Sequence, residues 1–95
     1  MRLKWSIKAL IDFDEAQVFI AQENQFAAQT VADRSWQASL RLPETPHIGR
    51  LGVEPDTRHW VVQRTPYLIV YRVQDETLEI LRVWHGRSDW MHRDD

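Results

Sequence analysis

The sequence predicts an α+β fold in which a short N-terminal strand and a helical hairpin precede a three-stranded antiparallel run, forming a small, mainly antiparallel sheet. Two patterns of apolar residues support this order of elements. Residues 7–22 carry apolar side chains at helical spacing without Gly or Pro, whereas apolar and polar residues alternate from residue 57 onward. The 95 residues, 43% of them hydrophobic and 27% charged, are enough for a single globular domain over 1–95.

The chain is predicted to open with a short strand over residues 3–5, followed by Ser6 as the N-cap of a helix over 7–22. Apolar side chains lie on two sides of this helix. They are Ile7, Leu10, Ile11, Val18 and Ala21 on one side, and Ala9, Phe13, Ala16 and Ile20 on the other. A helix that is apolar on two sides usually contacts two other elements. We therefore expect both sides to be buried within the fold, with a partner protein as the alternative for one of them.

A second helix is predicted over 25–42, with Asn24 as its N-cap. Its inner side consists of small residues that allow another backbone to come close. These are Ala28, Ala32, Ser35 and Ser39. Pro43 and Pro46 end the helix, and residues 42–56 are predicted to be an ordered connector without regular structure.

Three strands are predicted in the C-terminal half, over 58–62, 67–73 and 77–85. The middle strand is apolar on both faces, which predicts a central position in the sheet. Tyr67, Ile69, Tyr71 and Val73 lie on one face, and Leu68 and Val70 lie on the other. Asp75 and Glu76 suit the turn to the last strand.

Composition and charge exclude several classes of function. A formal net charge of −2 does not provide the broad positive field needed for strong, sequence-independent binding to nucleic acid. There is no cysteine, the four histidines are scattered, and no phosphate-binding loop is present, so we expect no metal and no cofactor. No apolar run approaches the roughly 20 residues that span a bilayer. We expect a cytoplasmic protein without a membrane partner.

Four short stretches occur in a fixed order in the C-terminal half. They are Gly49-Arg50-Leu51-Gly52, Thr57-Arg58, Pro66-Tyr67-Leu68-Ile69-Val70-Tyr71-Arg72-Val73 and Arg82-Val83-Trp84-His85-Gly86. With this set, the chain resembles the RelE/ParE superfamily of bacterial toxins from type II toxin–antitoxin modules, and residues 49–90 resemble its ParE branch. Two positions differ from the ParE pattern. Asp56 stands where the family usually has glycine, and the ending His85-Gly86-Arg87-Ser88 displaces the family's last arginine by one place.

The resemblance to the ParE branch implies a toxin that inhibits DNA gyrase by binding it, blocks replication, arrests growth and is neutralised by a cognate antitoxin. Resemblance to the RelE branch implies instead a ribosome-dependent mRNA endonuclease. A degenerate toxin that retains only antitoxin binding is a third alternative. Non-enzymatic action is the favoured interpretation, because ribosome binding favours a strongly basic surface and only two lysines, Lys4 and Lys8, are present.

Two sets of candidate site residues follow. If the protein cleaves RNA, His85 would transfer the proton and Arg58, Arg82 and Arg87 would supply positive charge. The sequence offers no second titratable partner for His85, so we expect this histidine to have a structural role. If the protein binds a partner, we expect an exposed cluster of aromatic residues and arginine near the C-terminus, together with apolar residues of the helical hairpin. The predicted contact residues are Trp84, Arg87, Trp90, Phe13 and Ile20, and residues 91–95 are predicted to be a flexible tail.

Overall fold

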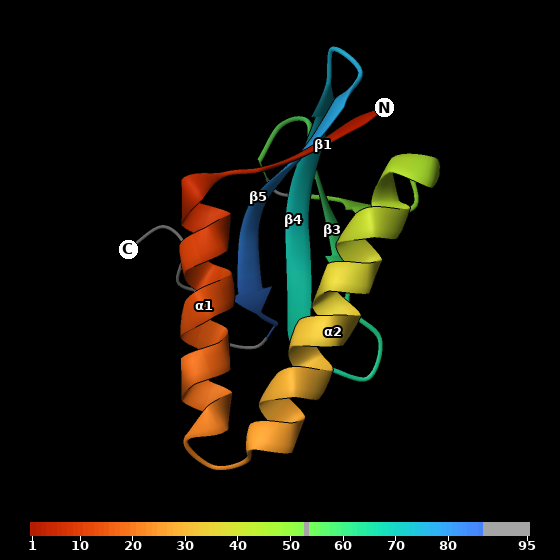
Figure 1. Cartoon of the computed structure of the whole chain (residues 1–95). Helices are drawn as coiled ribbons and strands as arrows, with labels where there is room; N and C mark the ends of the chain where they lie inside the picture. The colour runs from red at the N-terminus through yellow and green to blue at the C-terminus, as the bar shows by residue number, and fades with distance from the viewer. Residues whose placement is uncertain (53, 87–95) are drawn as a thin grey trace.

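The computed structural model describes residues 1–52 and 54–86, which form two layers. Both helices lie side by side on one face of a five-stranded sheet (Figure 1). The elements in chain order are β1 (Arg2–Trp5), α1 (Ile7–Ala21), α2 (Gln25–Arg41), a 3₁₀ turn (Leu42–Glu44), β2 (Arg50–Leu51), β3 (Thr57–Val61), β4 (Tyr67–Gln74) and β5 (Thr77–His85). The predicted α+β fold, its N-terminal strand and its helical hairpin are confirmed.

The strand order in the sheet is β1-β5-β4-β3-β2, so β4 is central, as its two apolar faces predicted. β1 runs parallel to β5, and the other neighbouring strands are antiparallel, which makes the sheet mixed. The prediction of no regular structure over 42–56 was wrong in two places, the 3₁₀ turn and β2. β2 has only two residues, too few to show a period, and it forms by pairing Arg50 with His59 and Leu51 with Arg58.

Both predicted helix caps are present. The Ser6 hydroxyl accepts a hydrogen bond from the backbone N of Ala9 at 3.0 Å, and the Asn24 side chain accepts one from the N of Ala27 at 3.0 Å. Each bond satisfies a backbone donor that has no partner within the helix. α1 ends at Ala21, and α2 begins at Gln25 after a tight turn. No helix among the described residues has the length and apolarity needed to cross a membrane.

The main core lies between the helices and the sheet. Ala9 of α1 is completely buried against β5, and Tyr71, Ile69 and Ile80 fill the space below the helices. Ala28, Ser35 and Ser39 are the buried residues of α2, in agreement with the predicted small inner side. A second, smaller cluster of Leu68, Val70 and Trp84 lies on the opposite face of β4 and β5.

The outer side of α1 contradicts the expectation that both apolar sides are buried. Ile7 is 76% exposed, Val18 is 63% exposed, and Leu10 and Ile11 are about half exposed. The opposite side faces the sheet, with Ala9 and Ala16 buried. One layer of helices on one face of a sheet covers only one side of each helix, so the second apolar side of α1 remains at the surface.

Candidate functional site

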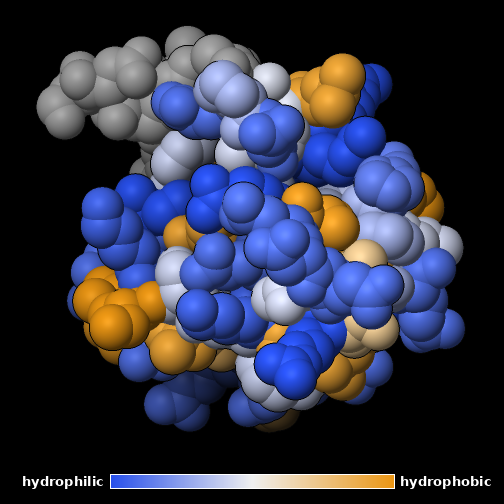
Figure 2. Space-filling model, turned by 90° about the horizontal axis from the view of Figure 1, so that it is seen from above, coloured by the Kyte–Doolittle hydropathy of each residue, from blue (hydrophilic) through white to orange (hydrophobic). Residues whose placement is uncertain are grey.

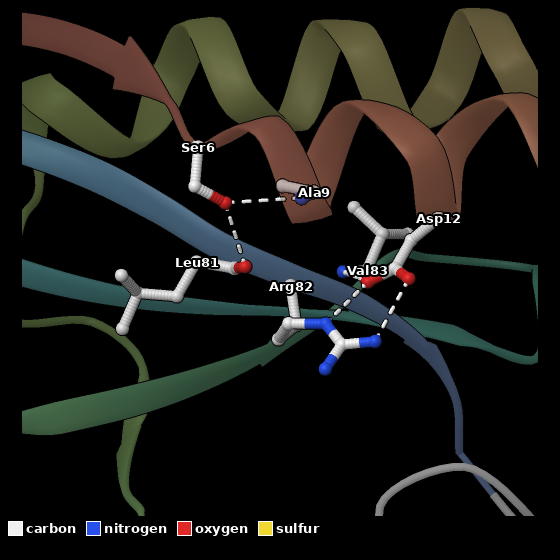
Figure 3. A network of polar contacts seen from close by, with 6 residues as sticks. All are labelled: Ser6, Ala9, Asp12, Leu81, Arg82 and Val83. Carbon is white, nitrogen blue, oxygen red and sulfur yellow. Dashed lines mark hydrogen bonds and ion pairs between the residues drawn. The ribbon is translucent and has the colours of Figure 1, made fainter.

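α1 protects the edge of β5 beyond the point where β1 ends. β1 pairs with β5 only as far as Ile80. Beyond it, the Ser6 hydroxyl donates a hydrogen bond to the carbonyl O of Leu81 at 2.8 Å, and the Asp12 carboxylate accepts one from the N of Val83 at 3.0 Å (Figure 3). These side chains satisfy backbone groups that an edge strand otherwise leaves open to pairing.

Arg82 forms a two-pronged ion pair with Asp12. Its Nε donates to Oδ2 at 2.7 Å and its Nη2 donates to Oδ1 at 2.9 Å (Figure 3). The guanidinium carbon also lies 5.3 Å from the ring centre of Trp84, within range of a cation–π contact. The Asp12 side chain is only 14% exposed, so the pair is shielded on the carboxylate side. The guanidinium of Arg82 therefore joins α1 to β5.

Arg58 and Tyr71 together hold the connector against the sheet. Arg58 Nη1 donates to the carbonyl O of His47 at 3.2 Å and to that of Gly49 at 2.8 Å. The hydroxyl of Tyr71 donates to the carbonyl O of Pro46 at 2.8 Å and accepts from the N of Gly49 at 3.0 Å. Burial raises the pKa of Tyr71, an effect opposed by the Gly49 hydrogen bond and by the nearby charge of Arg58.

The first glycine of the Gly-Arg-x-Gly stretch has a packing role in this anchor. A Cβ atom at Gly49 would lie 2.7 Å from the Tyr71 hydroxyl oxygen and 2.8 Å from the carbonyl O of His59. Only glycine lets the connector backbone approach the tyrosine closely enough for both hydrogen bonds. This part of the motif is thus explained by the local structure.

His85, Arg58 and Arg82 do not converge. His85 pairs with Tyr67 across β4 and β5, and the two rings meet edge to face with centroids 5.5 Å apart. Arg58 pairs with Tyr71, four residues further along β4, which is about 13 Å at the rise of a β-strand. Arg82 pairs with Val70, which lies on the opposite face of β4. Arg87, the fourth residue of this set, lies outside the described residues.

The structure places the predicted partner-binding residues differently from expectation. Trp84 is 8% exposed and packs with Leu68 and Val70, so the prediction of an exposed aromatic at this position was wrong. The reason is that Trp84 lies within β5, directly opposite Leu68, and shares its apolar face. Phe13 meets Trp5 edge to face at 5.7 Å, and Ile20 packs on the main core. Arg87, Trp90 and residues 91–95 lie outside the described residues.

Exposed apolar side chains gather instead on the outer face of α1, formed by Ile7, Leu10, Ile11 and Val18. Figure 2 shows hydrophobic patches within a mostly hydrophilic surface, with a large patch on the side that α1 occupies in Figure 1. Asp14 and Glu15 lie between Ile11 and Val18 in sequence and are also exposed. The apolar pattern of this face is visible in the sequence, where it predicted a buried side of the helix.

A groove of about 610 Å³ lies between α2, the connector and β3. Its apolar lining consists of Ala38, Leu42, Ile48, Trp60 and Val62. Arg34, Arg41 and Arg64 surround this lining, together with Asp33 and Glu44. The sequence offered little signal for this groove, because Arg34 and Arg41 resemble any solvated helix face and Arg64 joins them only through the fold. Among residues 1–52 and 54–86, no group of three or more His, Asp or Glu side chains is arranged to hold a metal ion.

Comparison with known proteins gives the family. The sequence pattern of the family described as "ParE toxin of type II toxin-antitoxin system, parDE" matches residues 3–90. The chain belongs to the ParE toxin family. The Sinorhizobium fredii protein Y4kP is 36% identical over 89 residues, or 94% of this chain and 92% of that protein. Toxin RelE2 of Caulobacter vibrioides is 36% identical over 82 residues, or 86% of this chain and 91% of that protein.

Solved structures agree on the fold of this ParE-family toxin. The chromosomal ParDE toxin–antitoxin system from P. aeruginosa superimposes with a TM-score of 0.79 at 24% identity, covering 90% of this chain and 95% of that one. The intact E. coli RelBE toxin–antitoxin complex gives a TM-score of 0.63 at 20% identity, covering 86% of this chain and 92% of that one. These structures show that the chain has the RelE/ParE-like fold. The family match over residues 3–90 makes it a toxin of a type II toxin–antitoxin system.

The structure also accounts for one departure of this ParE-family chain from the family pattern. Asp56 has a φ of 63°, in the left-handed region that glycine adopts at least cost. Aspartate is among the few other residues that visit this region regularly. The turn before β3 therefore keeps its shape with Asp56 in place of glycine. Ser88, the other departure, lies outside the described residues.

Proposed function

We propose that this ParE-family toxin acts by binding DNA gyrase and blocking replication, and that a cognate antitoxin neutralises it. The observation that carries the proposal is the engagement of Arg58 and Arg82 within the fold. Arg58 donates to two connector carbonyls, and Arg82 is paired with Asp12. Both guanidinium groups are engaged by groups of the fold itself, whereas an RNA-cleaving site would need its cations on the phosphate.

The chemistry of RNA cleavage makes this observation relevant. Attack by a 2′-hydroxyl needs a group that removes its proton, a group that protonates the leaving oxygen, and cations close to the phosphate. These groups must act within about 3 Å of the reacting atoms. Arg58 and His85 pair with Tyr71 and Tyr67, which lie about 13 Å apart along β4. This separation argues against a phosphate site shared by Arg58 and His85. A net charge of −2 argues against firm binding to ribosomal RNA.

The outer face of α1 favours action through a protein surface. Ile7, Leu10, Ile11 and Val18 form an apolar stripe on a helix whose other side is already packed on the sheet. Unpaired apolar stripes of this kind are typical of protein-binding surfaces. We infer that this face contacts gyrase, and that Asp14 and Glu15 favour a basic residue near the centre of the contact.

A plasmid assay tests the proposal. Purified toxin is incubated with gyrase and supercoiled plasmid without antitoxin, and we expect linear DNA that depends on gyrase. Val18→Lys, which introduces a charge into the α1 face, should lower the yield at least tenfold. Val61→Lys is the matched control, because Val61 is similarly exposed, at 60% compared with 63%, but lies on β3. Its yield should stay within twofold of the unmodified protein.

Other outcomes separate the alternatives. Cleavage of mRNA in a translating extract, without any gyrase-dependent product, would establish the endonuclease and refute the proposal. Binding to an antitoxin with neither activity would point to a degenerate toxin. Equal loss of linear DNA in Val18→Lys and Val61→Lys would leave gyrase as the target and remove the assignment of the α1 face.

A further inference from the structure

The outer face of α1 carries a stripe of apolar side chains that fits a second helix. α1 lies at one side of the molecule, with α2 beside it (Figure 1). Ile7, Ile11 and Val18 are spaced by four and seven residues, so they share one narrow stripe of a helix with about 3.6 residues per turn. These side chains are between 50% and 76% exposed. All three are β-branched and short, which lets another helix approach to the usual distance of about 8–10 Å between axes.

Two opposite charges lie on the same side of this stripe. A helix turns by about 100° per residue, which places Lys8 and Glu15 within about 20° of each other and places Asp14 on the other side of the stripe. Lys8 and Glu15 are separated by about 10.5 Å along the helix. Both are exposed, and neither has a hydrogen-bond or ion-pair partner for its side chain among residues 1–52 and 54–86. Each can therefore pair with a charge on another molecule.

Two antiparallel copies of α1 satisfy the stripe and the charges together. With a two-fold axis at the level of residue 12, residues whose numbers add to 24 lie opposite each other. Lys8 then lies within about 1.5 Å of rise from Glu15 of the second copy, and Ile7 lies equally close to Val18 of that copy. The two Ile11 side chains are neighbours beside the axis. Because the axis is perpendicular to the helices, Lys8 and Glu15 meet on the same side of the contact, and the ion pair occurs twice.

We propose that the outer face of α1 binds the same face of a second copy of this chain in an antiparallel, two-fold symmetric dimer. Lys8 of each copy pairs with Glu15 of the other. The dimer covers the stripe assigned above to gyrase, and this consequence alone rests on the proposed function. The monomer is then the form that meets gyrase, and the dimer is an inactive form that dissociates on dilution.

A second copy is the favoured occupant because the face is complementary to itself. A surface of uniform charge would place either Lys8 or Glu15 against a like charge, which is unfavourable at an interface. The size of the contact sets its strength. Each copy contributes one helix of 15 residues, about 22 Å long, which is less than the interface of about 1,600 Å² found in stable complexes. We therefore expect a dimer that dissociates at micromolar concentration.

Charge reversal tests the pairing by sedimentation equilibrium of the full chain. Lys8→Glu and Glu15→Lys each create two like-charge contacts, and each should weaken dimerisation at least tenfold. An equimolar mixture of these two variants should dimerise within threefold of the unmodified protein, because both ion pairs form again with their signs reversed. The matched control is Asp14→Lys. It makes the same charge change as Glu15→Lys at an exposed neighbour on the other side of the stripe, and it should alter the affinity by less than threefold.

A disulfide tests the geometry and its consequence for gyrase. The chain contains no cysteine, so Ile11→Cys introduces one thiol per copy. Beside the two-fold axis, the Cα atoms of residue 11 in the two copies come within the range of about 4.4–6.8 Å that a disulfide requires. Oxidation should cross-link Ile11→Cys but not Val61→Cys, which has its thiol at an exposed site on β3. The cross-linked Ile11→Cys protein should yield at least tenfold less gyrase-dependent linear DNA than the same protein after reduction.

The two parts of the inference fail separately. A protein that stays monomeric at high micromolar concentration, or a mixture of Lys8→Glu and Glu15→Lys that does not dimerise, would overturn the dimer. Equal yields of linear DNA from oxidised and reduced Ile11→Cys would overturn the masking of the gyrase face. Absence of linear DNA with the unmodified toxin would instead refute the proposed function and leave the dimer in place.

Discussion

Replacement of Asp12 by alanine tests the structural role assigned to Arg82. The Asp12 carboxylate accepts three hydrogen bonds, two from the Arg82 guanidinium and one from the backbone N of Val83. Removing it takes away both hydrogen bonds of the Asp12–Arg82 ion pair and the acceptor for the N–H of Val83 at the edge of β5. We expect Asp12→Ala to lower the free energy of unfolding more than any substitution of a purely exposed carboxylate.

The magnitude follows from the burial of the pair. An unsatisfied backbone donor costs about 1–3 kcal/mol, and removal of one partner from a fully buried ion pair costs about 3–5 kcal/mol. The energy for the ion pair must be reduced, because the Arg82 side chain is 36% exposed and its guanidinium can be solvated by water. The expected total is about 2–4 kcal/mol. At about 4–8 °C per kcal/mol for a domain of this size, a loss of 3 kcal/mol lowers Tm by about 12–24 °C.

Urea unfolding followed by circular dichroism measures this change. Asp14→Ala is the control, since Asp14 is exposed on the same helix and should change stability by no more than about 0.5 kcal/mol. A double-mutant cycle with Arg82→Ala should give a coupling energy of about 1–3 kcal/mol. A coupling near zero, or a loss below 1 kcal/mol in Asp12→Ala, would refute the structural role. Arg82→Ala should retain gyrase activity at temperatures where it remains folded.

Four further predictions concern the connector and its turns. Tyr71→Phe should lower stability by about 2–3 kcal/mol, because it leaves the N of Gly49 and the carbonyl O of Pro46 without their hydrogen bonds. Burial raises the pKa of Tyr71 in the folded state, so the unfolded state loses its proton first: stability should fall as pH rises above about 10. A pH titration of unfolding should show that this decrease is smaller in Tyr71→Phe. Gly49→Ala should cost about 1–3 kcal/mol in chemical denaturation, because the added Cβ meets the Tyr71 hydroxyl and a backbone carbonyl. Asp56→Gly should not destabilise the protein and should raise Tm slightly, since it relieves a positive φ of 63°; a clear fall in Tm would contradict the explanation given for that turn.

Local patterns in the sequence determined most of the architecture. Ser6 and Asn24 marked the starts of both helices, and the alternation in residues 67–73 identified the central strand. These signals are readable because caps and side-chain periods act between residues close in the chain. The ordered stretches from Gly49 to Gly86 similarly indicated the toxin family before any contact was known.

Only the tertiary structure decided how the charged and apolar side chains are used. Asp12 and Arg82 are 70 residues apart in sequence, and Tyr71 reaches Pro46 across 25 residues. The number of layers in the fold decides whether α1 buries one apolar side or both. Trp84 is buried because it lies opposite Leu68 of β4, on the same face of the sheet. Composition and spacing do not contain this information, because it arises from pairing between distant segments. Arg34 and Arg41 of α2 and Arg64 of the loop after β3 line one groove only because the fold brings these distant segments together. The sequence alone therefore does not indicate this groove.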